Sequence, residues 1–287
     1  PAAALAAYMD ESLSIPTATS VRTLPVGTLD AQRRRINQEL AAAGRREKLS
    51  FTHLIAWAVV RAAQAHPVMN TGYERRDGIP HRLVREVVNL GLAVDVERRD
   101  GSRSLLVPVV RDAGGLGFRG FRDAYDDLVG RTRAGQVKPD ELRGATMTLT
   151  NPGGLGTVAS IPRLMPGQGT IVATGAIGYP AGLASARPDA LRELGVEKVM
   201  TMTSTYDHRV IQGAESGAFL GEVERLLAGA DEFYEEVRES LGLSRAAAPE
   251  EAPEAPAAAP AAAPGAVDAE LLEAVAAAMS VVKAHRS

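Results

Sequence analysis

The segment Val199–Ala214 reads Val-Met-Thr-Met-Thr-Ser-Thr-Tyr-Asp-His-Arg-Val-Ile-Gln-Gly-Ala. Its first half alternates in polarity, with Thr201, Thr203 and Thr205 in one register, and this alternation predicts a β-strand. The strand runs into His208, which stands between an aspartate and an arginine, and the glycine that follows permits a tight entry into a helix. A histidine held at a strand end can carry protons near neutral pH. A purely structural histidine is equally compatible with these residues.

A second stretch, Thr146–Gly156, combines a threonine-rich strand pattern with a glycine-rich end. It reads Thr-Met-Thr-Leu-Thr-Asn-Pro-Gly-Gly-Leu-Gly. The glycines allow backbone to approach a ligand closely, but no Gly-Lys-Ser/Thr follows, so this is not a Walker A phosphate loop. At the strand end, Thr150 could donate its hydroxyl to a developing oxyanion. A glycine-rich turn without a functional role remains the alternative.

The other four histidines occupy positions that favour structural roles. His53 falls in an apolar helix pattern and His66 precedes a helix-ending proline. His81 lies in a polar turn, and His285 lies near the end of the chain. We expect all four to be structural.

Helical and strand patterns alternate along the chain, which predicts a mixed α/β (α+β) fold. Ser50 is the expected N-cap of a strongly apolar helix that contains Trp57, a core residue. Thr28 or Asp30 is expected to cap the preceding helix. The strand over residues 104–110 is almost continuously apolar, which predicts burial on both faces. Further helices are expected over residues 2–13, 118–133, 213–227 and 231–241, an extended arm over 15–26, and further strands over 86–97, 145–150, 169–177 and 196–206.

Composition and charge exclude several classes of protein. The 287 residues include 32 basic and 35 acidic side chains, a formal charge of −3, so we expect no nucleic acid or membrane partner. No stretch approaches the roughly 18 apolar residues of a membrane helix, and no signal peptide is expected. The cysteine count is 0, which excludes disulfides, thiolate zinc sites and a cysteine nucleophile. We expect no metal site and a cytoplasmic location.

The composition changes sharply near residue 245. From Pro249 to Pro264 the sequence holds only Ala, Pro and Glu, which predicts a disordered linker. The residues after it have apolar side chains at helical spacing but are too few to fold alone. We therefore expect one domain over residues 1–245, a linker over 246–266, and the first helix of a truncated neighbour over 267–287.

The two stretches described first resemble the catalytic domain of the 2-oxoacid dehydrogenase acyltransferases, the E2 components. The resemblance rests on Tyr206–Ala214 and Thr148–Gly154, and it spans about residues 1–243. It implies a chloramphenicol-acetyltransferase-like fold, with a mixed central sheet and flanking helices, that assembles as homotrimers with active sites between subunits. Further matching landmarks are Pro16-Thr17-Ala18-Thr19, Ser50-Phe51-Thr52-His53-Leu54, Asn89-Leu90-Gly91-Leu92-Ala93-Val94-Asp95 and Pro162-Arg163-Leu164-Met165-Pro166-Gly167-Gln168.

The resemblance also implies roles for individual residues. His208 would be the general base that takes the proton from the thiol of coenzyme A, or from dihydrolipoamide in reverse, and Thr150 would stabilise the tetrahedral oxyanion. Gln212 stands where most members of the family have an aspartate that forms ion pairs, so the groups that support His208 are altered. The expected contacts with coenzyme A are Asn151 and, because coenzyme A carries phosphates, Arg163 and Gln168. A solvated arginine on a surface loop is the alternative for Arg163.

The most similar subtype is the succinyltransferase-like domain of actinobacterial multifunctional 2-oxoglutarate dehydrogenases or decarboxylases, in which an E2-type domain is fused to an E1. Gln212–Gly217 and the tail Met279–Arg286 carry this resemblance. It implies transfer of a succinyl or related acyl group between coenzyme A and the lipoyl arm of a partner protein, alongside the fused E1 and other 2-oxoacid dehydrogenase components. Thiamine diphosphate and Mg are expected only in the missing E1 part.

Two other functions remain open. The same fold supports free acetyltransferases that act on small hydroxyls or amines. A non-catalytic module that trimerises and assembles a fused E1 would also account for Gln212. The presence of both His208 and Thr150 favours catalysis.

Overall fold

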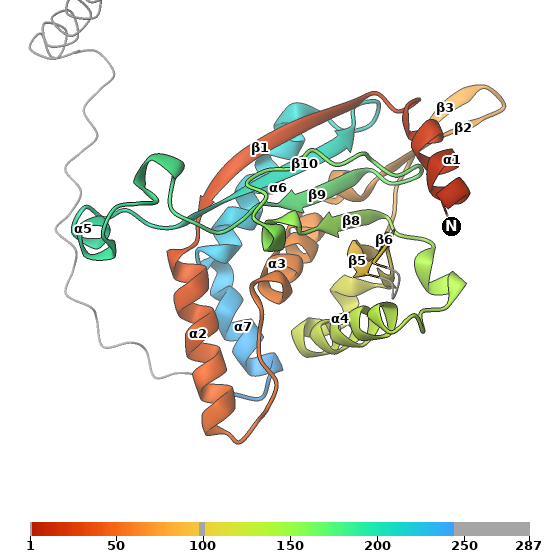
Figure 1. Cartoon of the computed structure of the whole chain (residues 1–287). Coiled ribbons are helices and arrows are strands. Elements are labelled where there is room, and N and C mark those ends of the chain that lie inside the picture. Colours follow the sequence, from red (N-terminus) through yellow and green to blue (C-terminus); the bar gives the residue numbers. More distant parts are fainter. Residues whose placement is uncertain (1, 98–100, 244–287) are drawn as a thin grey trace, which may run out of the picture. The chain divides into compact units, whose positions relative to one another are not determined.

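The central element of the fold is a mixed six-stranded sheet. In their order across the sheet, the strands are β1 (Thr17–Pro25), β10 (Val199–Asp207), β9 (Thr170–Thr174), β8 (Met147–Thr150), β4 (Leu90–Leu92) and β7 (Val109–Val110). The pairs β9–β8 and β8–β4 are parallel, and the other pairs in the sheet are antiparallel. The computed structural model describes residues 2–97 and 101–243, and Figure 1 shows β1, β10, β9 and β8 side by side.

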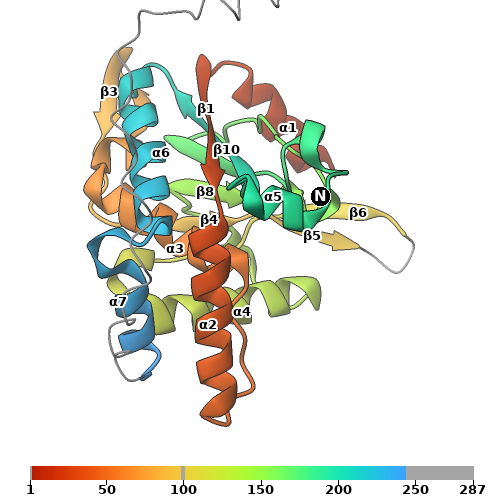
Figure 2. The same ribbon diagram turned by 90° about the vertical axis from the view of Figure 1, so that its left-hand side faces the viewer.

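Helices cover one face of this sheet. The helix α3 (Phe51–Ala65) packs against α6 (Gly213–Leu227), which also contacts β1 and β10. Trp57 of α3 is 1% exposed, and its ring centre lies 5.3 Å from that of Phe121, so its predicted core position is confirmed. The other α-helices of the described residues are α1 (Ala2–Ser12), α2 (Gly27–Ala42), α4 (Gly117–Arg133), α5 (Pro188–Glu193) and α7 (Phe233–Ser240). Figure 2 shows α2, α4 and α7 below the sheet.

The opposite face of the sheet is rich in threonine. In β10, Met202 lies in the core beneath the helices, whereas Thr203 and Thr205 point the other way. Thr203 donates to the carbonyl of Ser160 at 2.6 Å, and Thr205 shares a hydrogen bond of 2.8 Å with Thr19 of β1. The predicted alternation of β10 is therefore confirmed. We call the side that carries Thr203 and Thr205 the threonine face.

The starts of α3 and α2 test the predicted caps. The Ser50 side chain accepts the N–H of His53 at 3.2 Å, which confirms it as the cap of α3. The predicted capping of α2 by Thr28 or Asp30 is wrong, because α2 begins directly after Val26 and both residues lie inside its first turn. An aspartate in a first turn still interacts favourably with the positive end of the helix.

The predicted strand over residues 104–110 is in fact two strands. β6 (Arg103–Leu106) pairs with β5 (Val94–Glu97) in a separate two-stranded sheet, and the chain joins the central sheet only after Pro108. Proline has no N–H to donate to a sheet, so it separates the two strands. Leu105 is 53% exposed, so the predicted burial on both faces is wrong for β6, although β7 is buried.

A second hairpin consists of β2 (Gly72–Arg76) and β3 (Ile79–Leu83). The sequence patterns did not predict it, and the strand predicted over residues 86–97 divides into β4 and β5. Short 3-10 helices occupy Pro67–Asn70, Ala113–Gly115, Pro139–Leu142, Pro152–Leu155, Ala181–Leu183 and Ala230–Glu232.

Residues 1–245 belong to one compact unit. The linker predicted over 246–266 and the helix predicted over 267–287 lie outside the described residues. Within the described ranges, no helix combines the length and the apolar character needed to cross a membrane.

Candidate active site

His208 lies just after β10, in the turn that leads to α6. Its backbone N–H donates to the carbonyl of Pro16 at 2.9 Å, which ties the turn to the chain just before β1. The His208 side chain is exposed, and its ring centre lies 5.5 Å from that of Tyr206. An exposed imidazole on an anchored backbone can reach a substrate without a change of fold.

Asp207 and Arg209 hold this turn in place. Asp207 is 2% exposed, and its carboxylate accepts from Nε (2.8 Å), Nη2 (2.6 Å) and the backbone N–H (3.0 Å) of Arg209. The Asp207 carbonyl accepts from the N–H groups of Val210 and Ile211. Hydrogen bonding to Asp207 raises the pKa of Arg209. A buried carboxylate is stable here because a bidentate arginine pairs with it.

Gln212 occupies the N-cap position of α6. Its backbone is extended, with φ −101° and ψ 158°, and its N–H donates to the Glu215 carboxylate at 2.6 Å. The backbone carbonyl of Gln212 accepts from the backbone N–H of Glu215 at 3.1 Å. This is a position where aspartate caps a helix better than glutamine does. An aspartate would also interact with the positive end of the helix dipole.

Thr150 is the last residue of β8 and is half-buried. Leu149 packs into the core beneath the helices, so Thr150 points to the other side of the sheet. Thr150 pairs with Ala173 of β9, and Ala173 pairs with Thr203 of β10. Residues paired directly across a sheet share a face. The Thr150 hydroxyl therefore belongs to the threonine face.

The structure does not bring Thr150 and His208 together within one chain. Because Thr150 is level with Thr203, it lies five positions before His208 along the direction of β10. At about 3.3 Å per residue along a strand and about 4.8 Å between strands, the two Cα atoms are roughly 20 Å apart. A histidine and a threonine side chain cannot span that distance to meet at one thioester.

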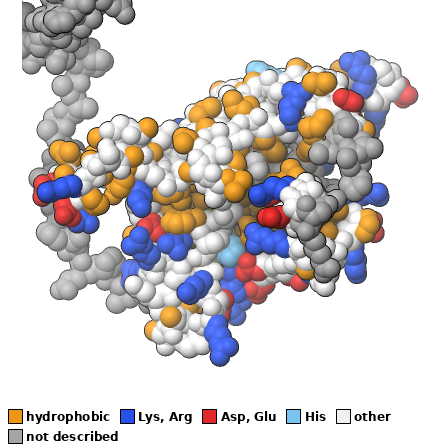
Figure 3. Space-filling view, viewed as in Figure 1, with side chains coloured by type: hydrophobic (Ala, Val, Ile, Leu, Met, Phe, Trp, Pro, Cys, Tyr) orange, Lys and Arg blue, Asp and Glu red, His pale blue; other side chains and the backbone are white. Residues whose placement is uncertain are grey.

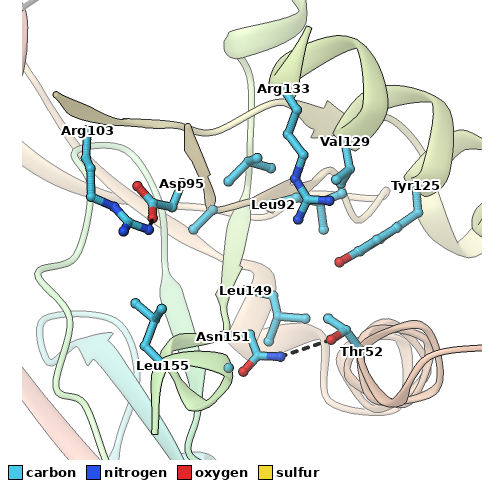
Figure 4. A pocket seen from close by; sticks show the side chains of 13 residues that line it. Thr52, Leu92, Asp95, Arg103, Tyr125, Val129, Arg133, Leu149, Asn151 and Leu155 are labelled. Carbon is cyan, nitrogen blue, oxygen red and sulfur yellow. Dashed lines mark hydrogen bonds and ion pairs between the residues drawn. The ribbon is translucent and has the colours of Figure 1, made fainter. Parts of the chain in front are cut away.

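A pocket of about 390 Å³ lies beside the end of β8, between that strand, α3 and α4. Its apolar lining includes Leu92, Val129 and Leu149. Asn151, one of the predicted contacts with coenzyme A, lies on its wall and donates from Nδ2 to Oγ1 of Thr52 at 2.9 Å (Figure 4). The pocket thus flanks the strand end that carries Thr150.

Two side chains from α4, Tyr125 and Arg133, face Asn151 across this pocket (Figure 4). Burial raises the pKa of Tyr125, so its hydroxyl stays protonated and can donate. Arg103, by contrast, forms an ion pair with Asp95. Among the described residues no carboxylate pairs with Arg133. An apolar lining with one uncommitted cation suits a ligand that has both an apolar part and an anionic group.

The other two predicted contacts with coenzyme A lie elsewhere. Arg163 is exposed in the segment between β8 and β9. Gln168 is 8% exposed, and its Oε1 accepts from the hydroxyl of Thr148 at 2.7 Å. Neither residue lines the pocket that contains Asn151. Within one chain the three predicted contacts do not form a single site.

His53 belongs to the framework of α3. It is 5% exposed, its Nδ1 accepts from the N–H of Ser50 at 3.3 Å, and its Nε2 lies 2.9 Å from a carboxylate oxygen of Asp126. Because Nδ1 accepts, the proton of the neutral ring is on Nε2 and is donated to Asp126. Burial lowers the pKa of His53, and Asp126 offsets part of this effect.

Two further histidines, His66 and His81, lie within the described residues. His66 follows α3, and His81 is exposed in β3. Across residues 2–97 and 101–243, no group of three or more His, Asp or Glu side chains could hold a metal ion.

Comparison of the sequence with known proteins identifies the family of this chain. The family model for the 2-oxoacid dehydrogenases acyltransferase (catalytic domain) matches residues 2–234. The chain is 48% identical over 239 residues to the 2-oxoglutarate dehydrogenase E1/E2 component of Corynebacterium glutamicum, covering 83% of this chain and 19% of that protein. It is 47% identical over 242 residues to the multifunctional 2-oxoglutarate metabolism enzyme of Mycolicibacterium vanbaalenii, covering 84% and 19%. The chain therefore spans about a fifth of the length of these curated relatives.

Solved structures share the fold. The dihydrolipoamide acetyltransferase of Azotobacter vinelandii aligns with a TM-score of 0.66 and 24% identity, covering 83% of this chain and 90% of that one. The truncated catalytic core of the 2-oxoacid dehydrogenase complex of Thermoplasma acidophilum aligns with a TM-score of 0.64 and 22% identity, covering 80% and 95%. These likenesses confirm the predicted fold class, a chloramphenicol-acetyltransferase-like mixed sheet with flanking helices. Given the match over residues 2–234, this chain belongs to the acyltransferase catalytic domains of the 2-oxoacid dehydrogenases.

Proposed function

We propose that this chain moves a succinyl group between coenzyme A and the dihydrolipoyl arm of a partner protein, as part of a 2-oxoglutarate dehydrogenase complex. The names of the Corynebacterium and Mycolicibacterium relatives support 2-oxoglutarate metabolism, and the family supports acyl transfer. The observation that carries the proposal is the exposed His208 side chain on a turn held by the ion pair between the buried Asp207 and Arg209.

In the proposed reaction, His208 removes the proton from the coenzyme A thiol. A thiol with a pKa of about 8.5 is only a few per cent thiolate at neutral pH, so a nearby imidazole base raises the supply of nucleophile. The thiolate forms a C–S bond to the carbonyl carbon of the succinyl-lipoyl thioester, and the Thr150 hydroxyl donates to the resulting oxyanion. Collapse of this intermediate breaks the C–S bond to the lipoyl sulfur, which leaves as a thiolate and takes the proton from His208.

We also propose that each site forms between two chains of a homotrimer, with His208 from one chain and Thr150 from its neighbour. The separation of roughly 20 Å within one chain supports this arrangement. So does the apolar surface on the threonine face, where Val21 is 60% exposed and Val158 and Ile161 are each 68% exposed. Figure 3 shows hydrophobic side chains on this side of the molecule. Exposed apolar surface of this kind is typical of an interface between chains.

The pocket beside β8 supports Asn151 as a contact for coenzyme A or its acyl group. Arg133 adds a cation that can meet an anionic group, and Tyr125 and Thr52 add hydroxyls. Arg163 and Gln168 remain proposed contacts. If they take part, a second chain must bring them to the substrate, because neither lines this pocket.

Gln212 is compatible with catalysis by His208. The Azotobacter structure comes from work on the roles of a serine, a histidine and an asparagine in that enzyme's catalytic mechanism, and its histidine and asparagine are four positions apart. In this chain an amide, Gln212, stands four positions after His208. We propose that Gln212 acts through the start of α6, where it caps the helix, rather than on the substrate.

The proposed partners follow from the curated relatives, of which this chain matches only 19%. We propose that a fused E1 with thiamine diphosphate and Mg produces the acyl group outside this chain. A lipoyl domain on another polypeptide would then carry it to His208. We propose a cytoplasmic location for the whole assembly.

A transfer assay tests the proposal. The chain should transfer succinyl from succinyl-CoA to free dihydrolipoamide, and His208→Ala should lower kcat by about 10²- to 10⁴-fold, the usual contribution of a general base. His81→Ala is the matched control, because His81 is also exposed but lies in β3. If wild type and His208→Ala are equally inactive while the oligomer persists, the chain is an assembly module instead.

A further inference from the structure

We infer that the β2–β3 hairpin positions the catalytic base, with Tyr73 and Arg82 as positioning residues for the turn that carries His208. The inference rests on the proposed role of His208. Tyr73 and Arg82 stand directly opposite each other in the hairpin. Side chains paired in this way lie on one face of a hairpin, so the two can act on one target.

Tyr73 contacts the turn through Arg209. The Arg209 guanidinium lies over the Tyr73 ring, with Cζ 3.7 Å from the ring centre. The same guanidinium holds both carboxylate oxygens of the buried Asp207. Arg209 is thus held between the Tyr73 ring and the Asp207 carboxylate. His208 lies between Asp207 and Arg209 in the sequence, so these contacts fix the backbone on both sides of it. A cation over an aromatic ring fixes the plane of the guanidinium.

Arg82 contacts the other end of the same turn. Its Nη2 donates to the carbonyl of Val210 at 2.8 Å. The backbone N–H of His208 donates to the carbonyl of Pro16. The turn is therefore held from the hairpin at Arg209 and Val210, and from the start of β1 at His208 itself.

The hairpin is not a strand pair of the central sheet. It forms a two-stranded sheet of its own, and Ile79 near its tip is 60% exposed. Isolated two-stranded hairpins are only marginally stable. Contacts with Arg209 and Val210 therefore link a peripheral element to the proposed base, and their loss should disturb the imidazole more than the core.

Steady-state kinetics of the full chain test the inference, with succinyl-CoA and dihydrolipoamide as substrates. Tyr73→Leu should lower kcat by about 5- to 30-fold, with little change in either KM, because a cation–π contact of ordinary strength is lost. The pH dependence of kcat should shift as well, since the imidazole samples other surroundings. Tyr73→Phe keeps an aromatic face and should retain most of the activity.

Arg82→Gln provides an independent measurement and should lower kcat in the same way. Arg75→Gln is its control, because Arg75 donates to the carbonyl of Gly78 within the hairpin tip and to no other group of residues 2–97 and 101–243. The inference is overturned if Tyr73→Leu and Tyr73→Phe behave alike, or if the variants lower the melting temperature while kcat and its pH profile stay unchanged. Either result would leave the proposed function unaffected. By contrast, a His208→Ala variant that remained active would contradict the proposed function itself. If Tyr73→Leu does not fold, Tyr73→Phe and Arg82→Gln decide the outcome.

Discussion

Thr150 and His208 lie near opposite ends of the same sheet, roughly 20 Å apart along and across its strands. A base and an oxyanion donor must both come within about 3 Å of the reacting atoms to act in one step. In the proposed reaction one chain would therefore contribute His208 to one site and Thr150 to another. Each proposed site would be complete only when a second chain places its Thr150 beside His208.

The Thr150 hydroxyl is expected to contribute to catalysis and not to folding. Thr150→Val keeps the shape of the side chain but removes the donor, so kcat should fall by about 10²- to 10³-fold. Thr150→Ser keeps a donor and should stay within about tenfold of wild type. The measurement is kcat for succinyl transfer, with the melting temperature as control. A Thr150→Val variant as active as Thr150→Ser would show that the hydroxyl does not stabilise the oxyanion.

Replacing Gln212 by aspartate should change stability more than rate. Aspartate is a preferred N-cap and interacts with the positive end of the helix, so Gln212→Asp should raise the free energy of unfolding by about 0.5–1 kcal/mol. Denaturant unfolding measures this change, and kcat should remain within about threefold of wild type if Gln212 acts through α6. A tenfold change in kcat at unchanged stability would instead assign Gln212 a direct part in the reaction.

Arg133 is expected to affect binding and not the chemical step. Arg133→Gln removes the uncommitted cation of the pocket, so the KM for succinyl-CoA should rise by about 5- to 30-fold at nearly constant kcat. Arg143→Gln removes an exposed arginine that does not line the pocket and should leave KM unchanged. Repeating the assay with acetyl-CoA shows which anion is bound. A larger effect on succinyl-CoA points to the acyl carboxylate, and equal effects point to the phosphates of coenzyme A. No change with either substrate contradicts the binding role.

His53 should make the chain less stable as the pH falls below about 6.5, the ordinary pKa of histidine. Burial lowers the pKa of His53 in the folded state, so the unfolded state binds the proton first. Stability then falls with decreasing pH, by at most about 1.4 kcal/mol per pH unit for one proton. The free energy of unfolding is measured at pH 7.5 and 5.5, because both values lie above the range in which carboxylates titrate. His53→Gln should lower stability at both values but show a smaller difference between them, and an equal difference would contradict the prediction.

Local chemistry in the sequence was enough to predict much of the framework. The hydroxyl of Ser50 identified the start of α3, and the threonine register identified β10, because capping and strand alternation depend on near neighbours in the chain. The dipeptide Asp77-Gly78, with φ of 50° and 80°, is a hairpin-turn signal that could have identified β2 and β3. The exposure of Leu105 could have been anticipated from Pro108, which interrupts the apolar run.

The candidate site depended on contacts that the sequence does not reveal. Tyr125, Val129 and Arg133 recur at helical spacing, which predicts a shared face of α4. Nothing local shows that Asn151 lies opposite that face, because the contact joins distant segments. The distance between Thr150 and His208 likewise depends on how β9 pairs with β8 and with β10. The register of these strand pairs is defined only in the folded chain.

The most direct test mixes two inactive variants. Each oligomer of His208→Ala chains keeps Thr150, and each oligomer of Thr150→Val chains keeps His208. When the two are unfolded together at equal amounts and refolded, random assembly should give an intact pair at about a quarter of the sites between chains, and succinyl transfer should recover to about a quarter of the wild-type rate. Each variant refolded alone should stay at its own low rate. If native mass spectrometry shows mixed oligomers and the rate does not rise above those of the separate variants, His208 and Thr150 do not meet between chains.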